Sequence, residues 1–193
     1  MAVTRGHEAD GRRACPRRHL QLLTAEGERR LPIAAYPHIP AANARIARLT
    51  GVEFGPDYER LLSGGSFVLD SEAAAAGLAA LRDQAPERGI ELAAAVQRVF
   101  YVDGRSLSDA STYEALAREL GLDADRAVAF FTGPEGRAAA AGDFAMARAL
   151  GVHQYPTLLV LHGGRVHVLP GVGNAPEVIT RHLDGVLGEP VRT

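Results

Sequence analysis

The sequence predicts an α/β fold in which a long helical region is followed by a β-hairpin and one more helix. Residues 157–161 form a short apolar run, Gly163 and Gly164 favour a two-residue turn, and residues 166–169 form the return strand. Upstream of the hairpin, apolar residues recur at helical spacing over most of residues 43–150. These two patterns place the only clear strands near the end of the chain.

Capping residues, glycine and proline mark the limits of the predicted helices. Asp70, Asp109 and Asp123 each stand where a helix starts, and Gly51 and Gly121 each follow an apolar segment. The expected helices span residues 43–51, a short turn around residue 58, 73–81, 90–102, 109–120, a segment from 123, 134–150 and 177–187. Three prolines in residues 32–42 predict an extended loop there.

The composition is ordinary for a globular protein. The 193 residues are 47% hydrophobic and 23% charged, with a formal net charge of -2, so we expect neither a nucleic-acid nor a membrane-surface binder. No apolar stretch approaches the roughly 20 residues of a membrane span, and the start of the chain lacks a continuous apolar signal region. The expected location is therefore the cytoplasm.

The first 42 residues differ from the rest of the chain. Residues 1–30 hold seven arginines and four acidic residues with little apolar periodicity, apart from a possible short strand at 20–23. Such a start is typical of a poorly ordered terminus. We expect one domain at 43–187, with a helical insertion at about 66–150, the hairpin and last helix at 151–187, and a tail at 188–193.

Several strings occur in an order that resembles a known family. They are ARIARLTG at 44–51, LDSE at 69–72, QRVFYVDGR at 97–105, LGLD at 120–123 and the YPT of Tyr155, Pro156 and Thr157. Over about residues 41–187 the chain resembles the DsbA family, in particular its cytoplasmic members described as predicted protein-disulfide isomerases. The resemblance implies a thioredoxin-like fold with a helical insertion, and thiol-disulfide oxidoreductase or isomerase activity on protein or small-molecule thiols.

The first βα unit of that fold is missing or degenerate in this sequence. The family's opening strand leads into a Cys-x-x-Cys pair at a helix start, whereas this chain has one cysteine and no such pair. We hypothesise that a mis-called or frame-shifted start replaces the true strand and cysteines. Without that strand, residues 157–161 would expose an apolar edge open to strand addition or to homo-oligomer formation.

Cys15 is the candidate catalytic residue, because Arg17 and Arg18 beside it would lower the pKa of its thiol. The alternative is a solvent-exposed thiol in a disordered segment. A single cysteine cannot form an intramolecular disulfide, so we expect the dithiol cycle to be impaired.

Gln154, Tyr155, Pro156 and Thr157 are the candidate substrate-binding residues. The resemblance implies that the backbone before this proline can hold an extended peptide or glutathione; the alternative is a structural turn at the entry of a strand.

Two other functions stay open. The first is a redox-inactive module that holds a peptide or a partner chain. The second is a relative of the kappa-class glutathione transferases and 2-hydroxychromene-2-carboxylate isomerases, for which glutathione would be the cofactor. We otherwise expect no cofactor, and no metal site, since His153, His162 and His167 lack accompanying metal-ligand residues.

Overall fold

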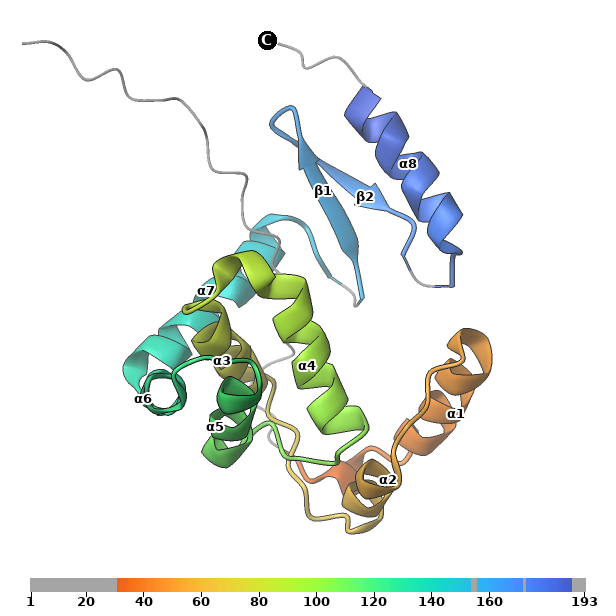
Figure 1. The fold of residues 1–193 in the computed structure, drawn as a ribbon. Helices are drawn as coiled ribbons and strands as arrows, with labels where there is room; N and C mark the ends of the chain where they lie inside the picture. The colour runs from red at the N-terminus through yellow and green to blue at the C-terminus, as the bar shows by residue number, and fades with distance from the viewer. Residues whose placement is uncertain (1–30, 154–155, 172, 189–193) are drawn as a thin grey trace, which may run out of the picture.

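The computed structural model describes residues 31–153, 156–171 and 173–188. Its helices and strands follow the predicted order, with helices first and the hairpin and one helix last (Figure 1). The elements are α1 (Ile39–Thr50), α2 (Pro56–Ser63), α3 (Ser71–Arg82), α4 (Gly89–Tyr101), α5 (Ala110–Glu119), α6 (Ala124–Thr132), α7 (Pro134–Ala149), β1 (Leu158–His162), β2 (Arg165–Leu169) and α8 (Pro176–Gly188).

Helices α3 to α7 form a packed body around one hydrophobic core. Helix α3 packs against α4, α5, α6 and α7, and α5 packs against α6. Seven residues of α3 are buried, which is why this helix lacks a polar face. Among the described residues, the largest fully buried side chains lie in this body: Tyr113, Leu81, Leu92, Leu116, Val96 and Val99.

The centre of the body depends on one glycine. The ring of Tyr113 lies against Gly77 so closely that an added Cβ would stand 1.8 Å from the ring carbon Cζ. The hydroxyl of Tyr113 donates a hydrogen bond of 2.9 Å to the carbonyl of Leu107, so its buried polar group is satisfied. Gly77 therefore sets the distance between α3 and α5.

Two of the three aspartates predicted to start helices act as side-chain caps. Asp70 Oδ1 accepts a hydrogen bond of 3.0 Å from the Ala73 amide, and Asp123 Oδ1 accepts one of 2.9 Å from the Arg126 amide. Asp109 precedes α5 as predicted, without a capping hydrogen bond from its side chain.

The prediction of an extended loop at residues 32–42 is wrong. Residues Ile33–Ala35 form a 3-10 turn, and α1 begins at Ile39, four residues before the predicted start. Pro40 lies in the first turn of α1, where a helix needs no N–H donor, so this proline does not prevent the helix. Pro32 pairs with Val68 in an isolated antiparallel bridge.

An aromatic cluster joins α1 and α2 to the body. The Asn43 side-chain amide of α1 donates a hydrogen bond of 3.1 Å to the hydroxyl of Tyr58 on α2. Tyr58 in turn stacks on Phe54 and lies edge-on to Phe100 and Tyr101 of α4, with ring centroids 5.2 to 5.6 Å away. Burial raises the pKa of Tyr58 and of Tyr101.

The hairpin and α8 form a second packed unit beside the body (Figure 1). Strands β1 and β2 pair antiparallel, with His162 opposite Arg165 at the turn and Leu158 opposite Leu169 at the far end. Gly163 and Gly164 both have positive φ, 57° and 72°, as a tight hairpin turn of this hand requires. Helix α8 packs against both strands. The predicted α/β fold with a helical insertion is confirmed.

No helix in the described part of the chain is long and apolar enough to cross a membrane.

Candidate substrate-binding site

The structure describes two of the predicted site residues. Pro156 is exposed and Thr157 is half-buried, directly before the first residue of β1. Gln154, Tyr155 and Cys15 lie outside the described residues. The predicted position of a proline at the entry of the first hairpin strand is therefore confirmed.

The segment that leads to this proline leaves α7 through a glycine. Gly151 has a φ of 76°, in the left-handed region that favours glycine at the end of a helix. The next amide, of Val152, donates a hydrogen bond of 3.0 Å back to the Ala147 carbonyl. Val152 itself is buried, so the start of the loop is fixed to the end of α7.

Strand β1 has one edge that β2 does not use. In an antiparallel pair closed by a two-residue turn, the residues at the turn form a hydrogen-bonded pair and every second residue does so along the strand. With His162 at the turn, Val160 and Leu158 also bond to β2, whereas Leu159 and Leu161 direct their N–H and C=O groups away from it. Among the described residues, no backbone hydrogen bond joins Leu159 or Leu161 to a segment outside the hairpin. The predicted open edge is present within this part of the chain.

One face of the hairpin is entirely aliphatic. Leu159 and Leu161 lie opposite Val168 and Val166, and these four side chains share a face because strand residues alternate. Val168 is 73% exposed, and Leu161 and Val166 are also exposed. Exposed aliphatic side chains that cluster in this way are typical of an interaction surface.

The opposite face of the hairpin holds two histidines. His162 and His167 share this face with Val160, by the same alternation. The Nε2 atom of His162 is buried and has no hydrogen-bond partner within the described structure. In that part of the chain, no three His, Cys, Asp or Glu side chains come together in a way that could hold a metal ion.

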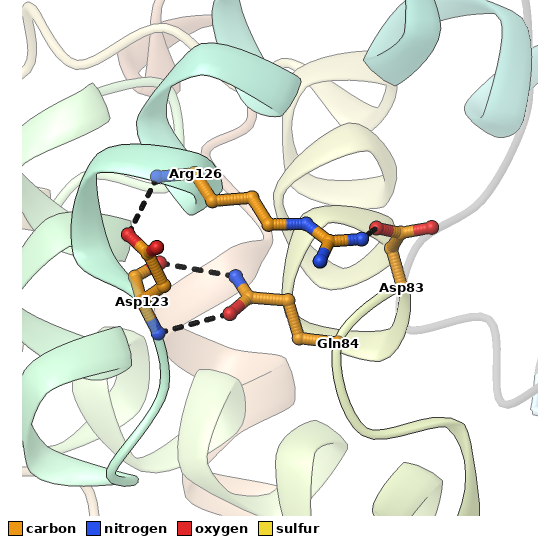
Figure 2. Close-up of polar contacts among 4 residues, drawn as sticks. All are labelled: Asp83, Gln84, Asp123 and Arg126. Carbon is orange, nitrogen blue, oxygen red and sulfur yellow. Dashed lines mark hydrogen bonds and ion pairs between the residues drawn. The ribbon is translucent and has the colours of Figure 1, made fainter.

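A polar clasp between α3 and α6 is the main feature that the sequence did not reveal (Figure 2). Gln84 donates a hydrogen bond of 3.1 Å to the Asp123 carbonyl and accepts one of 2.9 Å from the Asp123 amide. Arg126 forms an ion pair of 2.6 Å with Asp83. These contacts join residues about 40 positions apart, which no local pattern reports. The polar groups of these four residues bond to one another and so hold α3 and α6 together. We therefore assign the four residues a structural role.

A shallow hollow lies at the start of α3. It has room for about one water molecule and is lined by apolar atoms almost throughout, with Asp70 and Ser108 at its side. Its size excludes a substrate, so the hairpin entry remains the better candidate site.

A family model described as "DSBA-like thioredoxin domain" matches residues 38–181. The match spans helices α1 to α7 and the hairpin, and it ends within α8. No curated protein sequence matches the chain significantly.

Solved structures give the same result. The cytosolic disulfide reductase DsbM from Pseudomonas aeruginosa is 31% identical, with a TM-score of 0.68 over 80% of this chain and 77% of DsbM. Its structure with GSH is 32% identical, with a TM-score of 0.66 and the same coverage. A "putative protein disulfide isomerase" from Nitrosomonas europaea is 25% identical, with a TM-score of 0.70 over 82% of this chain and 76% of that protein.

Proposed function

We propose a ligand-binding function for this chain, which belongs to the DSBA-like thioredoxin domain family. The chain would bind a thiol or disulfide ligand at Gln154, Tyr155, Pro156 and Thr157. The chain is a homologue of a cytosolic disulfide reductase, and it has a single cysteine. One cysteine cannot close an intramolecular disulfide, which is consistent with impaired redox activity. The proposed location is the cytoplasm, and the proposed domain spans residues 43–187.

The observation that carries this proposal is the position of Pro156. It is exposed and lies two residues before Leu158, the first residue of β1. Among the described residues, the outward backbone groups of Leu159 and Leu161 have no partner outside the hairpin, so they can pair with an added strand. An extended ligand that pairs with such an edge gains main-chain hydrogen bonds. A DsbM structure contains GSH, so glutathione is the first ligand to test.

The binding test is calorimetric titration of S-methylglutathione, which cannot form a disulfide. Proline restricts the backbone before a ligand arrives, so Pro156→Ala should weaken binding by about tenfold, or about 1.4 kcal/mol. Pro134→Ala is the matched control, because Pro134 is also exposed but starts α7. No binding to the unmodified chain, or equal loss in both variants, would contradict the proposed site.

Cys15 needs a separate test, because it lies outside the described residues. Insulin reduction with glutathione as the electron donor should proceed at the uncatalysed rate both for the unmodified chain and for Cys15→Ser. If the unmodified chain speeds the reduction and Cys15→Ser abolishes that effect, Cys15 is a catalytic monothiol. The titration alone tests the binding proposal.

A second candidate function is a redox-inactive module that holds a peptide or partner chain. The aliphatic face of the hairpin favours it, since this surface is exposed among the described residues. It predicts that extended peptides without any thiol bind as well as those with one.

A further inference from the structure

The open edge of β1 has a symmetric arrangement of hydrogen-bonding groups. Leu159 and Leu161 each present one donor and one acceptor outward, and Val160 between them bonds to β2. We propose that this edge pairs antiparallel with the same edge of a second copy of the chain, around a two-fold axis at Val160. The second copy would occupy the same edge of β1 that the proposed ligand uses, but this inference does not depend on ligand binding.

The register follows from which residues face outward. Leu159 of one copy would pair with Leu161 of the other, and the two-fold axis repeats that pair. Each pair exchanges two N–H···O=C hydrogen bonds, so about four bonds join the copies. The two Val160 residues then face each other as a non-hydrogen-bonded pair, with Cα atoms about 4.5 Å apart. The product is a sheet of four strands with β1 and its mate at the centre.

The charge of the chain favours a second copy as the occupant. Strand β1 contains only aliphatic residues and His162, so none of the lysines, prolines or carboxylates that usually protect an edge is present. In the proposed register His162 lies opposite Leu158 of the other copy, so no like charges meet. The formal net charge of the whole chain is only -2, and weak net charge favours self-association.

The burial of the hairpin also favours a strand partner. The side chains of Leu158 and Leu161 on β1 are 38% and 41% exposed, and both would gain neighbours from an added strand. A two-stranded hairpin is marginal, whereas a sheet of three or more strands with an apolar face is stable. The other edge is a poorer choice, because β2 begins with the exposed Arg165 and a charged side chain at an edge opposes strand addition.

Cysteine crosslinking tests the register directly. In a Cys15→Ser background, Val160→Cys places two thiols across the two-fold axis, within the Cα separation of 4.4 to 6.8 Å that disulfides tolerate. Mild oxidation should convert most of the protein to a covalent dimer on a non-reducing gel. The matched control is Val168→Cys, which is more exposed but lies on β2 and should stay monomeric. Equal crosslinking of the two variants would overturn the proposal.

Sedimentation of the full chain tests the edge without any cysteine. The unmodified chain should show a monomer–dimer equilibrium, and Leu161→Lys should weaken dimer formation at least tenfold because edge lysines oppose strand addition. A far-ultraviolet spectrum checks that the variant stays folded. A chain that is monomeric at all concentrations would overturn the proposal, as would a dimer unaffected by Leu161→Lys. An edge that pairs with an added extended peptide and never with a second copy would also overturn it.

Discussion

The helical body and the hairpin unit of this chain differ in how they bury apolar surface. In the body, side chains such as Tyr113, Leu116 and Val96 are fully buried, and ion pairs and caps fix the helix ends. In the hairpin and α8, Leu169 is the one buried residue among those described, and Val168 is 73% exposed. The contrast indicates that the body supplies folding stability, while the hairpin presents surface for a ligand or a partner.

The largest effect should come from Gly77→Ala in the body. The new methyl group would collide with the ring of Tyr113, and overpacking of this kind costs about 3 kcal/mol of unfolding free energy. Urea denaturation measures the loss. The matched control is Gly142→Ala on α7, where an added Cβ meets nothing within 4 Å, so the variant should gain about 0.5 to 1 kcal/mol. Similar losses of unfolding free energy at both sites would show that the close contact of Gly77 with Tyr113 does not determine the packing of α3.

Tyr113→Phe should cost about 1 to 3 kcal/mol, because it leaves the Leu107 carbonyl without its hydrogen bond. The cost should also depend on pH. Burial raises the pKa of Tyr113 above its usual value near 10, so the unfolded chain ionises first and the unmodified protein loses stability as pH rises above 10. The phenylalanine variant lacks this loss. Its deficit, measured by urea denaturation, should therefore shrink between pH 8 and pH 11, and a constant deficit would argue against the buried hydroxyl.

The clasp between α3 and α6 should have an intermediate effect. Gln84→Ala removes two hydrogen bonds to the backbone of Asp123 and should cost about 1 kcal/mol. Arg126→Ala removes an exposed ion pair and should cost less, about 0.5 kcal/mol. Thermal unfolding ranks the two variants by their loss of stability. A larger loss for Arg126→Ala would mean that the ion pair, rather than the Gln84 side-chain amide, is the main link between these helices.

The smallest effect should come from the aliphatic face of the hairpin. Val168→Thr changes an exposed side chain and should shift the unfolding free energy by less than about 0.5 kcal/mol. The same substitution at Val96, which is fully buried, should cost several times more, since it buries a hydroxyl. Equal losses of unfolding free energy at Val168 and Val96 would mean that another segment covers the hairpin face and buries it as fully as the core.

Local signals in the sequence were sufficient for most of the fold. Asp70 and Asp123 cap the helices predicted to start there, and the Gly163–Gly164 pair closes the predicted hairpin. The predicted start of α1 is wrong because a proline such as Pro40 can equally begin a helix or belong to a loop. Contacts such as that of Gly77 with Tyr113 depend on how distant helices approach, which spacing along the chain does not encode.

The candidate site was predictable in part. The proline before a strand identified the position of Pro156, and the missing opening strand of the family fold predicted that β1 has an edge without a neighbour. The sequence pattern did not assign which residues of β1 face outward. The register set by the turn at Gly163 and Gly164 assigns Leu159 and Leu161 to that role. Gln154, Tyr155 and Cys15 remain predictions.

Amide hydrogen exchange at two protein concentrations is the most direct test of an open β1 edge that pairs with a second copy. The amides of Leu159 and Leu161 should exchange rapidly in dilute protein and slowly in concentrated protein, whereas that of Val160, bonded to β2, should be protected in both. Protection of Leu159 and Leu161 that is equally strong in dilute protein would contradict the account, because another segment of the same chain would then occupy the edge.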